Sequence, residues 1–175
     1  MWVRTLASMY LLSASPVCAS DVSDIVNLFN SVCIEADDPF AAAEQGSISS
    51  GWTRNEKLSG SQSSSSAQAI NTNTWDVRGT AFTGQLALSM IEDKNGSSQL
   101  CAISVDHFDD ATLETALAAR LNLGAPSHRS VNGTTIQSTW AGHDKTNLGI
   151  WYLSQRLAAG PGAQIGIAKR QQNGP

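Results

Sequence analysis

Apolar and polar residues alternate most regularly in two runs, 85–91 and 100–105, on either side of Asn95-Gly96. Alternation with a period of two indicates half-buried β-strands, and an Asn-Gly pair is typical of a type I′ hairpin turn. A turn at this pair predicts the facing pairs Met90 with Cys101, Leu88 with Ile103, and Leu86 with Val105. All of these residues are apolar, so we expect one face of the hairpin to be buried, because a one-residue slip would expose it.

Two other segments show the three- and four-residue spacing of amphipathic helices. The first runs from Asp21, and its apolar stripe consists of Val22, Ile25, Val26, Phe29, Val32 and Cys33. The second follows the hairpin, with Asp109 as the expected N-cap, Phe108 packing against Leu113, a stripe of Leu113, Leu117 and Leu121, and Gly124 as the left-handed end. A shorter helix is expected to start at Asp38-Pro39 and to end at Gly46.

The rest of the chain is predicted as strands joined by turns. The polar, Ser-rich segment 55–74 contains little apolar surface, which favours a flexible loop. Further strands are expected at 75–79, 134–140, 147–157 and 163–169, with Gly84 as a breaker, turns at Asn132-Gly133 and Gly160-Pro161-Gly162, and a disordered tail at 171–175.

This order of elements predicts an α+β fold in a single domain spanning residues 20–170. Strands joined by hairpins form antiparallel sheets, and about five to six strands are expected. The N-terminal and central helices each have one apolar stripe, so both should pack on the sheet face that holds Leu88, Cys101 and Ile103. The expected architecture is a two-layer sandwich.

Residues 1–19 have the pattern of a secretory signal peptide: Arg4, an apolar run from Leu6 to Leu12, and the small-residue site Val17-Cys18-Ala19. The apolar run is too short to span a bilayer, so no transmembrane segment is expected in the mature chain. The predicted location is the periplasm or the extracellular space. Cleavage before Cys18 with acylation of its sulfur is the alternative, although Pro16-Val17 fits a lipoprotein site poorly.

The charge of the chain argues against nucleic acid as a partner. The net charge is −4, loss of Arg4 with the leader makes the mature chain more acidic, and basic residues do not cluster. Charged residues make up only 15% of the chain. The sequence does not predict an oligomeric state.

Cys33 and Cys101 are the two cysteines that follow the leader, and in an oxidising compartment such a pair favours a structural disulfide. Each lies on the apolar stripe of its own element, which would place the N-terminal helix against the hairpin. The alternative, a redox-active dithiol, lacks the Cys-x-x-Cys spacing typical of that chemistry.

Candidate catalytic residues do not form a motif. His107, His128 and His143 lack metal-ligand spacing, and Asp106, Asp109 and Asp110 are explained by helix capping as well as by a cation site. No nucleotide-binding loop is present, so we expect neither a metal nor another cofactor. Catalysis is not predicted, and the enzymatic alternative is a small hydrolase that uses His107, Asp109 and a serine from the loop.

Trp140, Trp151 and Tyr152 form the candidate binding surface, because aromatic side chains on a sheet can stack on ligands. Large aromatic residues more often belong to the core of a small domain, and for the tryptophans burial is the favoured interpretation. A contiguous exposed patch around them would instead indicate a subunit stabilised by a partner.

A helix ending in cysteine (Val26 to Cys33), the Gly51-Trp52 step and the strand Leu100-Cys101-Ala102-Ile103 resemble small uncharacterised exported proteins of Gram-negative bacteria. The resemblance implies a periplasmic location and no particular activity. The function expected from the sequence is therefore a non-catalytic periplasmic binding or accessory module for a protein, a peptide or another envelope component.

Overall fold

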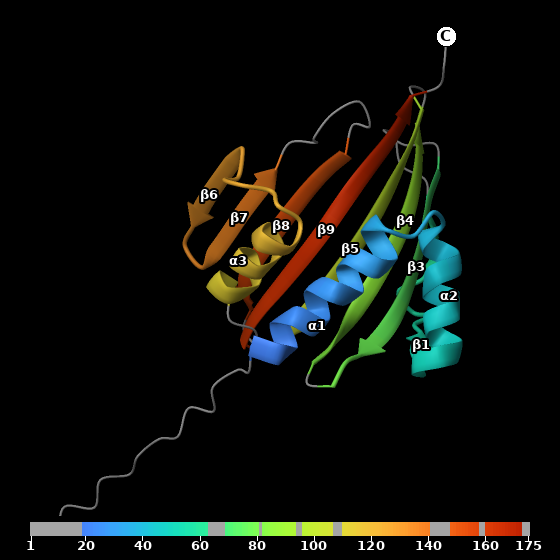
Figure 1. The fold of residues 1–175 in the computed structure, drawn as a ribbon. Helices are drawn as coiled ribbons and strands as arrows, with labels where there is room; N and C mark the ends of the chain where they lie inside the picture. Colours follow the sequence, from blue (N-terminus) through green and yellow to red (C-terminus); the bar gives the residue numbers. More distant parts are fainter. Residues whose placement is uncertain are drawn as a thin grey trace, which may run out of the picture.

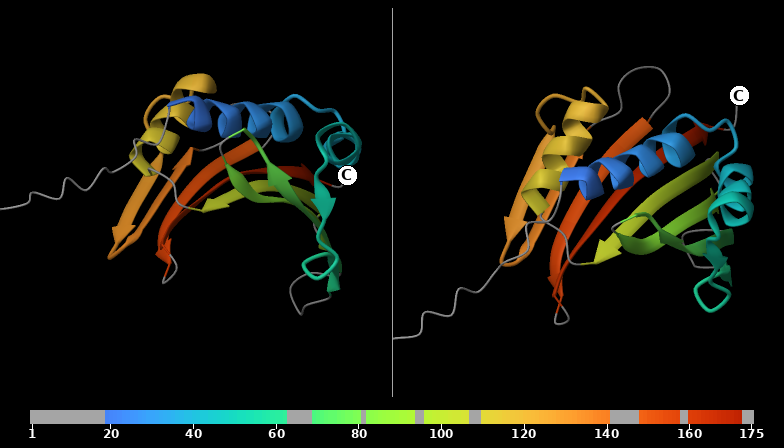
Figure 2. Two further views of the ribbon diagram at one scale, coloured as in Figure 1. Left: turned by 90° about the horizontal axis from the view of Figure 1, so that it is seen from below. Right: turned by 60° about the horizontal axis from the view of Figure 1, so that its bottom comes forward.

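The computed structural model describes residues 19–62, 69–80, 82–93, 96–106, 110–140, 148–157 and 160–172. In this part of the chain, nine strands form one antiparallel sheet in the order β1-β3-β4-β5-β9-β8-β7-β6, with β2 paired to β3. The helices pack on one face of the sheet (Figure 1), and the sheet arches so that its two edges bend away from them (Figure 2). The predicted α+β class is confirmed.

The helices are α1 (Ala19–Phe29), a π-helical turn η1 (Asn30–Ile34), α2 (Pro39–Ser50) and α3 (Asp110–Arg120). The strands of the first half are β1 (Thr53–Arg54), β2 (Gly60–Gln62), β3 (Ala69–Arg78), β4 (Thr83–Asp93) and β5 (Gly96–Asp106). Those of the second half are β6 (His128–Asn132), β7 (Thr135–Trp140), β8 (Leu148–Leu157) and β9 (Gly160–Gln172). Because β9 returns to pair with β5, the two halves form one sheet.

The core lies between the helices and the sheet. All six residues of the predicted α1 stripe are buried, as are Leu113 and Leu117 of α3. They pack with sheet residues of which the largest fully buried ones are Trp75, Leu86, Leu88, Ile103, Ile165 and Ile167. The prediction that α1 and α3 cover the face of Leu88, Cys101 and Ile103 is confirmed.

The register of the central hairpin differs from the prediction by two residues. Leu88 faces Cys101 and Leu86 faces Ile103, and the last pair before the turn is Asp93 with Gly96. Gly96, predicted as a turn residue, is therefore paired in β5, and residues 94 and 95 lie outside the described part. A shift of two residues leaves every side chain on its predicted face, since the side-chain period of a strand is two.

The helix ends follow local hydrogen bonding and packing. The Asp38 carboxylate accepts hydrogen bonds from the backbone N–H groups of Phe40 (2.9 Å) and Ala41 (3.2 Å), as an N-cap should. The helix does not end at Gly46: a Cβ there would lie 2.2 Å from the Trp52 ring, so glycine allows Trp52 to pack on α2. Gly51, with φ +67°, ends α2.

At the end of α3, Asn122 (φ 52°) is the left-handed residue that ends the helix; Gly124, predicted for this role, is also left-handed (φ 69°) but lies two residues further on. The N–H of Leu123 bonds the carbonyl of Ala118 (3.0 Å) and that of Asn122 bonds Ala119 (3.4 Å), which is a Schellman motif. Leu123 is thereby buried. The proposed cap Asp109 and Phe108 lie outside the described residues.

Several expected loops are strands. Within the predicted loop 55–74, residues 60–62 form β2 and residues 69–74 belong to β3, while 63–68 lie outside the described part. Gly84 pairs with Val105 and does not interrupt β4. Gly160-Pro161-Gly162 pairs with β8, and β9 extends to Gln172 in the predicted tail. These segments have weak β propensity and are ordered by strand pairing.

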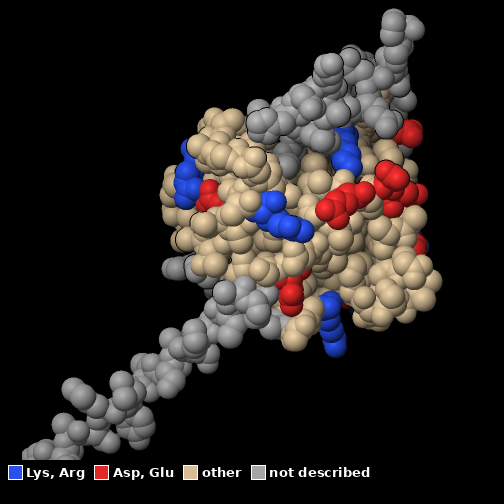
Figure 3. Space-filling view, viewed as in Figure 1, with Lys and Arg blue, Asp and Glu red and all other residues tan. Residues whose placement is uncertain are grey.

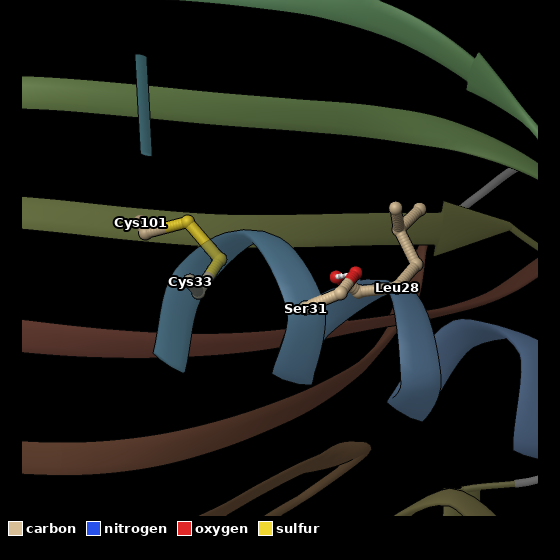
Figure 4. Close-up of a disulfide and its surroundings, with 4 residues drawn as sticks. All are labelled: Leu28, Ser31, Cys33 and Cys101. Carbon is tan, nitrogen blue, oxygen red and sulfur yellow. Dashed lines mark hydrogen bonds between the residues drawn. A yellow bond between two sulfur atoms is a disulfide. The ribbon is translucent and has the colours of Figure 1, made fainter. Parts of the chain in front are cut away.

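A disulfide joins Cys33 in η1 to Cys101 in β5, as predicted, with Cα atoms 5.6 Å apart and a sequence separation of 68 (Figure 4). In the π-helical turn, the N–H of Glu35 bonds the carbonyl of Asn30 (2.9 Å), and the buried Asn30 amide donates to the Glu35 carboxylate (2.6 Å). Both cysteines are buried. A buried disulfide of this kind has a structural role.

The fold predicts that Leu88→Ala is much more destabilising than Ser89→Ala. Leu88 is fully buried, so its truncation should lower the free energy of unfolding by about 2–5 kcal/mol through cavity formation. Ser89 lies on the other face and shares one hydroxyl bond with Thr72 (2.9 Å), worth about 1 kcal/mol. Urea denaturation of both variants measures the two losses in the free energy of unfolding. A greater loss for Ser89→Ala would mean that the core lies on the other face of the sheet.

Cys33→Ser should destabilise the protein by about 4 kcal/mol, because the disulfide closes a long loop in the unfolded chain. The measurement is chemical denaturation of the variant and of the wild type, oxidised and reduced. Reduced wild type should behave like the variant. Equal stability of oxidised and reduced wild type would contradict a stabilising role.

Candidate functional site

The sheet has a helix-free face, which we define by the strand positions that alternate with the core residues of β3, β4, β5 and β9. Figure 2 shows that this face is the hollow side of the arch. In the register, its residues with described side chains include Ile70, Thr72, Thr74, Asp76, Arg78, Thr83, Gln85, Ala87, Ser89, Ile91, Ser98, Leu100, Ala102, Ser104, Asp106, Gln164 and Ala168. Its middle is lined by small side chains.

A polar row crosses four neighbouring strands of this face. The register aligns Asp76 of β3 with Gln85 of β4, Ser104 of β5 and Gln164 of β9. Asp76 is held in place by amide donors: its carboxylate accepts from Asn55 Nδ2 (3.2 and 3.3 Å) and from Gln85 Nε2 (3.3 Å). The hydroxyl of Ser104 makes no hydrogen bond within the described part of the chain.

A cavity of about 410 Å³ opens over the end of this row, beside the β3–β4 connection. Charged and polar side chains line it: Asp76, Arg78, Thr83, Gln85, Ser104 and Asp106. Arg78 and Asp106 are exposed and take part in none of the ion pairs found among the described residues. A second hollow, of about 220 Å³, lies on the same face beside Lys57, Leu58 and Thr72.

The opposite, helix-covered side has fewer features of a binding site among the described residues. In Figure 3 its basic and acidic side chains are few and of interspersed sign, so the described residues form no charged patch on this side. The exposed large hydrophobic residues among those described are Ile48, Leu58 and Val131, which lie on α2, in the β1–β2 connection and on β6. The candidate functional site is therefore the cavity on the helix-free face.

The predicted aromatic surface is described only in part. Trp140 is only 4% exposed, and its indole N–H donates to the carbonyl of Gly124 (3.1 Å), so it belongs to the core. The backbone of Trp151 is paired with Gly166, and that of Tyr152 with Ile165. The side chains of residues 151 and 152 lie outside the described part, so their place on a binding surface stays a prediction.

Those of the other predicted candidates that the structure describes do not converge. His128 is exposed on the edge strand β6, Asp106 ends β5 and Asp110 begins α3. His107, Asp109 and His143 lie outside the described residues. Among the residues that are described, no group of three or more His, Cys, Asp or Glu side chains is arranged to hold a metal ion.

A serine–carboxylate pair that the sequence did not reveal joins α3 to the sheet. The Ser138 hydroxyl donates to Glu114 Oε1 (2.7 Å), and Arg129 donates to the same oxygen. Ser138 is fully buried, and the Glu114 side chain is 13% exposed. A hydroxyl with no access to solvent and a carboxylate shared with arginine form a structural contact, because a nucleophile must reach its substrate.

Sequence reasoning also missed the polar row. Its signal is present in the alternation of Trp75-Asp76-Val77-Arg78, in which apolar and charged residues take turns. The convergence of Asp76, Ser104 and Asp106 depends on strand pairing. This convergence could be inferred only once the strand order β3-β4-β5 was known.

Comparison of the chain with protein-family models, with curated proteins and with solved structures finds no match. Across the described helices, none is long and apolar enough to cross a membrane. Function is therefore inferred from the geometry of the helix-free face and its cavity.

The contact between Ser138 and Glu114 predicts that Glu114→Ala lowers the free energy of unfolding by about 1–3 kcal/mol, because it leaves a buried hydroxyl without its acceptor. Glu44→Ala is the matched control. Glu44 Oε1 lies 3.8 Å from Arg54 Nη1 at the surface, and such exposed ion pairs contribute less than about 1 kcal/mol to stability. Thermal and urea unfolding measure both. Equal small losses would show that the contact does not hold α3 to the sheet.

Proposed function

We propose that this chain is an exported, non-catalytic binding module that presents the helix-free face of its sheet to a protein, a peptide or another envelope component. The observation that carries the proposal is the contrast between the two faces. Helices bury one face, while the other holds a polar row and a cavity with charged groups that make no ion pair among the described residues. A sheet face without a helical layer usually faces solvent or a ligand.

Export is supported by two observations. The leader-like pattern of residues 1–19 predicts secretion, and the Cys33–Cys101 disulfide is typical of oxidising compartments. The apolar stripe of α1 begins at Val22, so cleavage at the end of the leader would keep the whole stripe.

Site-specific photo-crosslinking in a host that exports the protein tests the proposal. The crosslinking amino acid is placed at Ser104 or Thr83 on the helix-free face, and at Arg120 or Glu35 on the helix-covered side as controls. Adducts should form from the first two positions and not from the controls. Adducts that form only from the control positions would contradict a binding role for the helix-free face.

The same preparation gives the intact mass of the exported chain. A mass that lacks residues 1–19 and carries one disulfide supports export to an oxidising compartment. Retention of the leader, a lipid on Cys18 or two free thiols would contradict that part of the proposal.

A further inference from the structure

We propose that the cavity over the polar row binds a small zwitterion that carries both an ammonium and a carboxylate, as in a free amino acid or a short peptide. This inference rests on the proposed function and names the ligand class of the same face. It is carried by three charged side chains around one cavity of about 410 Å³: Arg78, Asp76 and Asp106.

Arg78 supplies the group for the carboxylate. Its guanidinium has five N–H donors in a planar fork that matches a carboxylate, and it makes no ion pair among the described residues. Its backbone position is fixed by the tight β3–β4 connection. There, Gly79 N–H bonds the Phe82 carbonyl (3.0 Å), and a Cβ on Gly79 would lie 2.1 Å from the Phe82 ring.

Asp106 and Asp76 supply the groups for the ammonium. Asp106 has no polar partner in the described part of the chain, so its carboxylate oxygens are available to ammonium donors. Asp76 is already oriented by Asn55 and Gln85, and a carboxylate has lone pairs left after two or three such bonds. The ligand therefore meets acceptors that are held in place before it binds.

Gly84 also lines the cavity, at a point where β4 and β5 lie close together. A Cβ on Gly84 would lie 2.3 Å from the Ser104 carbonyl oxygen and 3.0 Å from Val105 Cγ1, so only glycine permits this spacing. The cavity volume is in the range typical of small-molecule sites, about 300–1,000 Å³.

The charges of the cavity select among ligand classes. Two carboxylates and one guanidinium carry a net negative charge, which disfavours a phosphate or another simple anion. A sugar usually stacks on an aromatic ring, and the described residues that line the cavity include none. A zwitterion complements both signs with one small molecule.

Titration of the ¹⁵N-labelled, disulfide-bonded protein with L-alanyl-L-alanine, followed by NMR, tests the inference. Backbone amides of Thr83, Gln85, Ser104 and Asp106 should shift in a saturable way. N-acetyl-L-alanyl-L-alanine and L-alanyl-L-alaninamide should each bind at least about tenfold more weakly, because each lacks one of the two charges that the cavity contacts. Unaltered binding of the blocked dipeptides would overturn the proposal, as would shifts with glucose but not with the dipeptide.

Arg78→Gln and Asp106→Asn should each weaken dipeptide binding about tenfold or more. Arg120→Gln on α3 and Asp37→Asn before α2 make the same chemical changes at exposed positions outside the cavity and should leave binding unaltered. Equal effects of the cavity and control variants would overturn the site. Crosslinks from the helix-free face without any dipeptide response would overturn this inference alone, whereas crosslinks only from the helix-covered side would overturn the proposed function itself.

Discussion

The disulfide between Cys33 and Cys101 connects the end of the first helical segment to a strand in the middle of the sheet, and much of the architecture depends on this contact. It holds α1 across the sheet, where the α1 stripe and Leu113 and Leu117 of α3 bury the same face. The π-helical turn that carries Cys33 is closed by the bonds between Asn30 and Glu35. With α1 in place, one side of the sheet is committed to the core.

That commitment leaves the other side for function. The arch of the sheet makes the helix-free face hollow, and strand pairing brings Asp76, Ser104 and Asp106 to one end of it. The same alternation that puts Trp75 and Val77 in the core puts Asp76 and Arg78 on the open face. The core and the proposed binding face thus lie on opposite faces of the same strands, so substitutions in the cavity should not disturb the core.

Two contacts at the edges of the sheet also help to keep the helices off the helix-free face. Glu114 links α3 to Ser138 and Arg129 on the β6–β7 hairpin, and Trp52 packs over Gly46 to place α2 beside β1 and β3. Both contacts lie away from the cavity. They fix the helices at the two sides of the sheet and leave the polar row uncovered by any described helix.

The sequence by itself determined the elements whose hydrophobic pattern is strong: the α1 stripe, the α3 stripe, the central hairpin and the pairing of Cys33 with Cys101. It determined which face of β4 and β5 is buried, because the period of two survives even a two-residue error in register. Tertiary structure alone decided the strands within 55–74, the extension of β9 to Gln172 and the burial of Trp140, because these segments gain their order from partners distant in sequence. It also decided the cavity: Asp76 and Arg78 lie on β3 and Asp106 ends β5, and only the order β3-β4-β5 brings the charge of Asp106 to the other two.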